Sequence, residues 1–195
     1  MTLMRLMALI LCLAALVITP GESQASPGWE GPPCINLIAN GNFEEDGGWE
    51  MGKTPKMARY STDKSHEGSR SMLLGNLNPQ EDVFSFSSIW QDITIPPEAY
   101  EVTLNFWYLA ISQDPEGLDE QKVVLINPDD NSILGVPWKR RGSTGEWRSE
   151  SLPLPNVPKG KKIRIYFGVF NDGDGKPSAM YLDEVSVMAC VQPTP

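Results

Sequence analysis

A series of short runs rich in β-branched and aromatic residues constrains the fold of this 195-residue chain more than any other feature. Turn-forming residues separate the runs, among them Asn40-Gly41, Asp46-Gly47-Gly48 and Pro128 to Asn131. Runs of this length, with turns between them, are typical of β-sandwiches and β-barrels. No segment has a convincing helical period. The expected strands are Cys34–Ala39, Ala58–Ser61, Ser71–Leu74, Ser87–Ile95, Glu101–Ile111, Lys122–Asn127, Ser132–Val136, Trp147–Leu154, Lys162–Phe170 and Ala179–Ala189.

Alternation along these runs assigns each side chain to a face, because successive side chains of a strand point to opposite sides. Each of the longest runs has one apolar face suited to a core and a second, mixed face that carries an aromatic residue. The expected core residues are Ile89, Ile93, Ile95, Val102, Leu104, Phe106, Tyr108, Ile163, Ile165, Phe167 and Val169. The expected outward residues are Trp90, Asn105, Trp107, Arg164, Tyr166 and Phe170.

Residues 1–25 are expected to be a secretory signal peptide. Arg5 precedes an uncharged apolar run from Leu6 to Ile18, and Ser23-Gln24-Ala25 offers small residues to a signal peptidase. The run is shorter than the roughly 20 residues that span a bilayer. An uncleaved anchor is the alternative. The remaining chain divides into a flexible lead-in (26–33), one domain (34–190) and a Pro/Thr tail (191–195), so we expect a secreted or cell-surface protein with no membrane span after cleavage.

The formal net charge is -9, which argues against nucleic acid and anionic membranes as partners, since both need a basic surface. We expect a monomer. Once the signal leaves, Cys34 and Cys190 form an even pair in an oxidising compartment, which predicts a disulfide between the two ends of the domain. Two unrelated free thiols are the alternative.

Five motifs stand out along residues 34–188. They are Asn36-Leu37-Ile38-Ala39-Asn40-Gly41-Asn42-Phe43-Glu44 with Trp49, His66-Glu67-Gly68-Ser69-Arg70-Ser71-Met72-Leu73-Leu74, Trp90-Gln91-Asp92-Ile93-Thr94-Ile95-Pro96, Leu104-Asn105-Phe106-Trp107-Tyr108 and Tyr181-Leu182-Asp183-Glu184-Val185-Ser186-Val187. Together, and in this order, they resemble carbohydrate-binding modules of the cellulase and xylanase type, the family four, nine, sixteen and twenty-two group. The resemblance implies an all-β jelly-roll β-sandwich of two antiparallel sheets, the galactose-binding-like fold. It implies little about the ligand, because this fold serves many functions.

The resemblance also implies a structural calcium. Its carried-over ligands are Glu44 and Asp183, with backbone oxygens near Asn42 and in the Lys64–Glu67 turn, and calcium prefers such oxygen ligands. By alternation Asp183 shares a face with Val185 and Val187, and a buried carboxylate needs a partner. The alternative is that Asp183 accepts backbone N–H groups without a metal. Asp172 to Lys176 superficially resembles a calcium loop, but it lacks a third acid and a distal Glu, which favours a hairpin turn.

Outward aromatic rings are the means by which a secreted sandwich would hold a sugar, because C–H faces stack on Trp and Tyr. The candidate ligand-binding residues are Trp90, Asn105, Trp107, Arg164 and Tyr166. For Trp107 a packing role is the alternative. Trp49 and Trp147 are expected in the core or at its rim. Residues 138–141 (Trp-Lys-Arg-Arg) are expected to form a basic loop, either solvated or able to reach an acidic partner.

No catalytic constellation is recognisable. The single His66 lies in a turn motif, and His66, Cys34 and Cys190 are too few soft ligands for a zinc site. The sequence therefore predicts a non-catalytic binding module for an oligo- or polysaccharide. The alternatives are an extracellular structural or adhesion module that contacts protein, and a stabilising jelly roll without a ligand.

Overall fold

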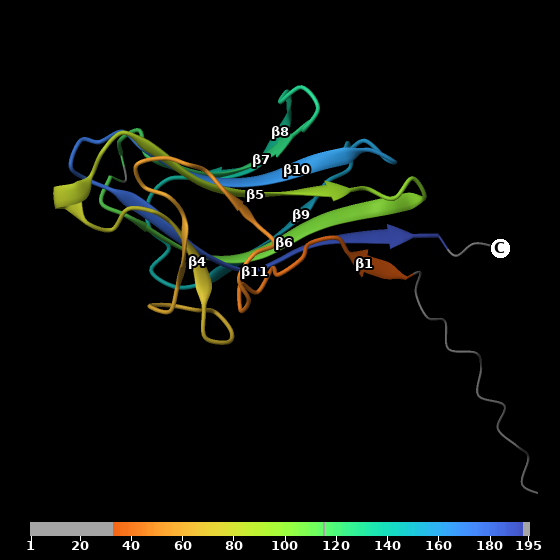
Figure 1. Cartoon of the computed structure of the whole chain (residues 1–195), viewed down its shortest axis with the longest axis horizontal. Helices are drawn as coiled ribbons and strands as arrows, with labels where there is room; N and C mark the ends of the chain where they lie inside the picture. Colours follow the sequence, from red (N-terminus) through yellow and green to blue (C-terminus); the bar gives the residue numbers. More distant parts are fainter. Residues whose placement is uncertain (1–32, 115, 193–195) are drawn as a thin grey trace, which may run out of the picture. The chain divides into compact units, whose positions relative to one another are not determined.

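The computed structural model describes residues 33–114 and 116–192, all of which belong to one compact unit. The expected signal peptide, residues 26–32 of the lead-in and residues 193–195 of the tail lie outside the described residues. Two antiparallel sheets lie face to face, as the edge-on view of Figure 1 shows. Within the described residues no helix is long and apolar enough to cross a membrane.

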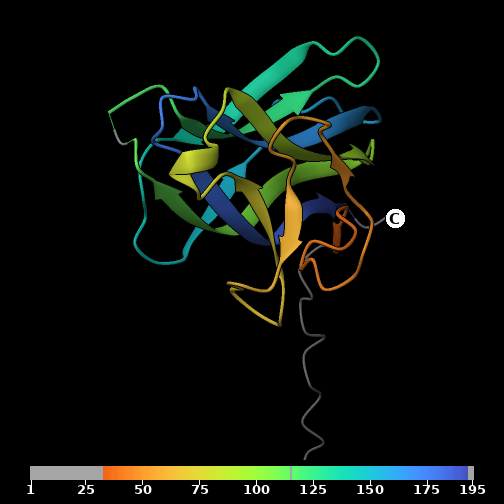
Figure 2. The ribbon, with the colours of Figure 1, turned by 60° about the vertical axis from the view of Figure 1, so that its left-hand side comes forward.

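One sheet has six strands and the other has five. The six-stranded sheet has the order β3-β4-β11-β6-β9, with β1 also paired to β11, and the five-stranded sheet has the order β2-β5-β10-β7-β8. Figure 2 shows the teal-green β7 and β8 at one border of the molecule. The elements are β1 (Cys34–Asn36), β2 (Glu50–Met51), β3 (Arg59–Ser61), β4 (Ser71–Gly75), the 3-10 helix η1 (Pro79–Glu81), β5 (Ser85–Thr94), β6 (Ala99–Ser112), β7 (Glu120–Ile126), β8 (Ile133–Arg140), β9 (Arg148–Pro153), β10 (Lys162–Asn171) and β11 (Ser178–Val191).

The core lies between the sheets and consists of the side chains that alternation placed inward. Phe106, Phe167 and Ile165 are among its largest fully buried members, and Trp49 packs against Phe43 and Phe167. Every expected strand overlaps an observed one, and the two-residue β2 is the strand that the pattern did not predict. The all-β, two-sheet sandwich expected from the sequence is confirmed.

Two details of the strand predictions are wrong. The segment 138–141 is not a loop, because β8 continues to Arg140 and turns Trp138 inward. Trp138 is buried against Phe106 and Tyr108, and its Nε1 donates to Glu150 Oε1 at 3.1 Å. The sequence predicts a strand that ends at Val136, because Gly135 and Pro137 interrupt the β-branched pattern.

The second error concerns Asp183, which does not share a face with Val185 and Val187. A β-bulge lies between Asp183 and Ser186, where Glu184 has a φ of 50°. The extra residue shifts the alternation, so Asp183 lies on the outer side of the six-stranded sheet, opposite Trp107, while Val185 and Val187 belong to the core. Asp183 is nevertheless fully buried, because the loop between β3 and β4 covers it.

The predicted disulfide is present. Cys34 of β1 is bonded to Cys190 of β11, and the two residues are directly paired in the strand register. The bond closes a loop across a sequence separation of 156 residues and holds the beginning of the domain against its end.

Candidate functional site

The outward side of the five-stranded sheet carries most of the predicted ligand-binding residues. We call this surface the open face. It is built from alternate residues of two central, directly paired strands, β5 and β10. Its side chains are exposed or half-buried. The residues that define it are Phe84, Phe86, Trp90, Asp92, Arg164, Tyr166 and Phe170.

Trp90 and Tyr166 form the centre of the open face. They are register partners on β5 and β10, and their rings are nearly parallel, with centroids 6.4 Å apart and an interplanar angle of 15°. Tyr166 lies across the next outward position, where a Cβ on Gly168 would come within 2.7 Å of its Cε1. A glycine at 168 is therefore required for this ring position. We call the two nearly parallel rings together the platform.

A charged pair borders the platform. Arg164 Nε donates to Asp92 Oδ1 at 2.7 Å and Arg164 Nη2 donates to Asp92 Oδ2 at 3.1 Å, the two-pronged geometry that fixes both groups. The guanidinium carbon also lies 5.4 Å from the centre of the Trp90 ring. The hydrogen bond and the charge of Asp92 raise the pKa of Arg164, so the guanidinium stays charged beside the rings.

Three phenylalanines extend the open face along the same two strands. Phe86 and Phe170 are register partners with ring centroids 4.7 Å apart, and Phe84 packs edge-on against both. Phe84 is 64% exposed and Phe86 is 43% exposed. Sequence reasoning missed Phe84 and Phe86, because the expected strand began at Ser87, although the alternation continues two residues earlier.

Trp107 and Asn105 do not lie on the open face. Both are on β6, in the other sheet, so the structure separates them from Trp90, Arg164 and Tyr166. The His66 ring stacks on Trp107 at 3.7 Å, with Trp147 beside it, which matches the alternative packing role. Asn105 accepts a hydrogen bond from Ser151 Oγ at 2.7 Å. Both residues line a separate shallow pocket with Glu150 and Glu184.

Trp107 belongs to what we call the covered face, the outer side of the six-stranded sheet. Here a second small apolar cluster is buried, formed by Leu73, Leu109, Ala179 and Tyr181. Trp147, at the rim as expected, packs against it. The loop between β3 and β4 closes over the neighbouring part of the face through His66.

Glu44 and Asp183 both bind the loop between β3 and β4. Asp183 Oδ2 accepts from His66 N at 2.8 Å and Asp183 Oδ1 accepts from Glu184 N at 2.8 Å. Glu44 Oε1 accepts from the backbone N of Ser69 and of Arg70, and its Oε2 accepts from Ser69 Oγ. Asn42 Oδ1 accepts from Glu44 N.

The pKa values of the two carboxyl groups shift in opposite directions. The Ser69 hydroxyl and two backbone N–H groups lower the pKa of Glu44. Burial raises the pKa of Asp183, against the opposing effect of its backbone N–H donors. The four carboxylate oxygens are thus satisfied by hydrogen bonds alone, which matches the alternative interpretation of Asp183, and calcium at Glu44, Asp183 and Asn42 stays a prediction.

Two groups of side chains in the described residues have the spacing of metal ligands. One is His66, Glu67 and Glu184; the other is Asp114, Asp172 and Asp174. In each group one ligand atom per residue lies within 4.8 Å of the others. The second group brings Asp172 and Asp174, which lie in one turn, close to Asp114, which is distant in the sequence.

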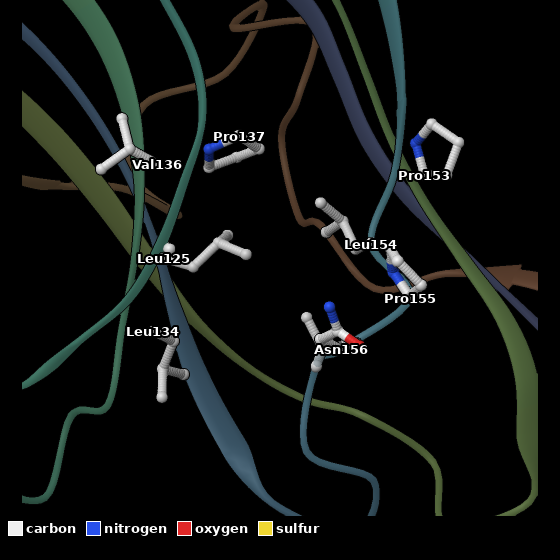
Figure 3. A pocket seen from close by; sticks show the side chains of 10 residues that line it. Leu125, Leu134, Val136, Pro137, Pro153, Leu154, Pro155 and Asn156 are labelled. Atoms are coloured by element: carbon white, nitrogen blue, oxygen red, sulfur yellow. The ribbon is translucent and has the colours of Figure 1, made fainter.

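An apolar hollow opens elsewhere, at the edge of the sandwich. Figure 3 shows Leu125, Leu134, Val136 and Pro137 on one side of it, facing Leu154, Pro155 and Asn156 on the other. Leu134, Val136 and Pro137 come from β8, an edge strand. The exposed fractions of Ile133, Leu134 and Val136 are 67%, 44% and 48%.

Comparisons with known proteins place the fold. Neither a protein-family model nor a curated sequence matches the chain. Among solved structures, a family 61 carbohydrate-binding module in complex with β-1,4-galactotriose is similar with a TM-score of 0.57 and 14% identity, over 78% of this chain and 97% of that one. A family 16 carbohydrate-binding module has a TM-score of 0.52 and 15% identity, over 78% and 99%.

An adhesin domain is similar to the same degree. The K1 cleaved adhesin domain of Lys-gingipain from Porphyromonas gingivalis has a TM-score of 0.54 and 14% identity, over 80% of this chain and 97% of that one. At such identities the likeness concerns the fold. It confirms the jelly-roll β-sandwich fold expected from the sequence, which these carbohydrate-binding modules share.

Proposed function

We propose that the domain is a secreted, non-catalytic module that binds an oligo- or polysaccharide on its open face. The observation that carries this proposal is the parallel pair of Trp90 and Tyr166 beside the Arg164–Asp92 pair. Sugar rings present apolar C–H faces that pack on aromatic rings, while their hydroxyls need polar partners at the border. The open face offers both on adjacent positions of β5 and β10.

The fold and the disulfide support the same proposal. The solved structures of this fold include a module bound to β-1,4-galactotriose. A disulfide joins Cys34 to Cys190. Disulfides form and persist in oxidising environments such as the outside of the cell, so this bond supports secretion. The calcium predicted at Glu44 and Asp183 does not enter the proposal, because hydrogen bonds already satisfy both carboxylates.

Retention on insoluble polysaccharides and a glycan array test the proposal. Trp90→Ala and Tyr166→Ala remove one ring each from the platform, and each is expected to weaken binding about tenfold or more, equivalent to roughly 1.4 kcal/mol. Tyr100→Ala is the matched control, since Tyr100 is 45% exposed on β6 of the other sheet. The proposal fails if the wild-type protein retains no glycan, or if both platform variants bind as well as the control.

A second candidate function is adhesion to an extracellular protein. The apolar edge at β8, with the hollow of Figure 3, favours it, and the fold is also that of an adhesin domain. Leu134→Lys places a charge at the rim of this hollow and would abolish such binding, while Trp90→Ala would leave it intact. Loss of protein binding in Trp90→Ala alone would contradict this candidate.

A further inference from the structure

Three carboxylates from two loops meet at one end of the sandwich. Asp114 follows β6, and Asp172 and Asp174 lie in the turn between β10 and β11. One oxygen of each lies within 4.8 Å of the others. Calcium binds oxygens at about 2.3–2.6 Å, so two oxygens on one ion are at most about 5 Å apart. The three carboxylates can therefore share a single ion.

A fourth carboxylate, Asp119, is buried beside them and lacks a partner on one oxygen. Asp119 is only 2% exposed, its N donates to Asp114 Oδ2 at 3.4 Å, and its Oδ1 accepts from Asp172 N at 2.9 Å. These bonds place Asp119 between the two loops. The Ser178 hydroxyl lies near this carboxyl, but the buried Oδ2 has no hydrogen-bond partner of normal geometry among the described residues. A buried, unsatisfied carboxylate oxygen is costly and indicates that a water molecule or an ion is needed there.

The charge balance points the same way. Asp114 is also buried, at 3% exposed. The ion pair found at this cluster among residues 33–114 and 116–192 joins Lys176 Nζ to Asp174 Oδ2 at 3.3 Å. Lys176 is well exposed and forms its ion pair with the outermost carboxylate, and its charge also acts on Asp114 and Asp172. One lysine therefore offsets only part of the charge of the four carboxylates.

The loops hold these side chains in place. Asp172 Oδ1 accepts from Asp174 N and Asp174 Oδ1 accepts from Lys176 N, which fixes both carboxylates within the turn. On the other loop Gly117 lies against Asp114, where a Cβ would overlap Asp114 Oδ2. The Asp172–Lys176 turn therefore supplies its ligands from a defined conformation, and Asp119 is hydrogen-bonded to both Asp114 and Asp172.

We propose that Asp114, Asp172 and Asp174 bind one calcium ion, with Asp119 as the buried acid behind them. All the donors are carboxylate oxygens, the ligands of a hard divalent cation, and neither His nor Cys belongs to this group. The sequence pattern of Asp172 to Lys176 lacks a third acid, and Asp114 supplies it from the loop that follows β6. The proposal does not depend on the proposed sugar-binding function.

Calorimetric titration of the chelator-treated mature protein with calcium chloride tests the site. The wild type is expected to bind calcium at this site, and magnesium more weakly. Asp172→Asn with Asp174→Asn is expected to bind calcium about tenfold more weakly or worse, because ligand charge sets the affinity of such sites. Asp174→Asn alone, at an exposed position, is a second variant whose folding is not at risk and is expected to lose affinity as well.

Matched controls separate this site from other acids. Asp129→Asn with Asp130→Asn removes the same charge from the exposed turn between β7 and β8 and is expected to bind like the wild type. Glu44→Gln is also expected to bind like the wild type. The proposal is overturned if the wild type binds no calcium, if the Asp172/Asp174 variants bind normally, or if affinity is lost only in Glu44→Gln.

Discussion

The covered face and the open face are built from the same kind of alternating strand, but loops bury the first while the second is exposed to solvent. On the covered face Tyr181 and Leu73 are fully buried under loops, and the aromatic Trp107 is stacked beneath His66. On the open face Trp90 and Tyr166 remain half-exposed. An outward aromatic residue in a strand therefore has two possible roles, and the loops between strands decide which one it takes.

Replacing one tyrosine on each face gives the largest expected difference. Tyr181→Ala should lower the free energy of unfolding by about 3–5 kcal/mol, because it empties a closed apolar cluster. Tyr166→Ala should cost about 1 kcal/mol, since its ring is half-exposed. Urea unfolding followed by fluorescence measures both values. Equal losses would mean that the two faces do not differ as described.

Removal of the disulfide probes the sheet that carries the covered face. Cys34→Ala with Cys190→Ala should lower the free energy of unfolding by about 2–4 kcal/mol, chiefly because the unfolded chain gains freedom. Glycan binding by the folded protein should not change, since β5 and β10 belong to the other sheet. Reduced affinity in a folded double variant would instead couple the disulfide to the open face.

The smallest expected effect is a pH dependence from the covered face. Burial by the loop between β3 and β4 raises the pKa of Asp183 above its ordinary value of about 3.9. The protonated form is thus favoured in the folded state, so its contribution to stability is full below the unfolded pKa and is lost as pH rises through the raised pKa. A carboxyl-carbon NMR titration measures this directly. A pKa at or below the ordinary value would show that the N–H donors of His66 and Glu184 outweigh burial.

Much of the sandwich could be predicted, because period-two alternation survives in most strands. The inward positions of Val102 through Tyr108 on β6 and of Ile163 through Val169 on β10 followed directly from it. The predicted face of Asp183 was wrong, because a β-bulge follows this residue. Glu184 adopts a positive φ in the bulge, and a residue other than glycine gives no sequence signal for such a φ. A β-bulge is an extra residue in one strand relative to the strand paired with it, so the sequence of the first strand alone does not reveal it.

The candidate site could be predicted only in part, for a different reason. Alternation gave the side of each strand to which Trp90, Tyr166 and Trp107 point, but the sheet that each strand joins depends on pairing between distant segments. The sequence therefore assigns Trp107 and Tyr166 to the same candidate binding face, although the two residues lie in different sheets. The cluster of Asp114 with Asp172 and Asp174 could not be predicted for the same reason, because it forms only where two loops that are distant in the sequence meet.

The pairing of Cys34 with Cys190 also determines how the domain responds to tension. A force that pulls on the chain before Cys34 and after Cys190 passes through one covalent bond, since the two residues are linked directly. The hydrogen-bonded ladders between Cys34 and Cys190 lie outside this path, so they carry little of the load. A domain held at its two ends would therefore keep its ligand-facing surface intact while its attachment is stretched.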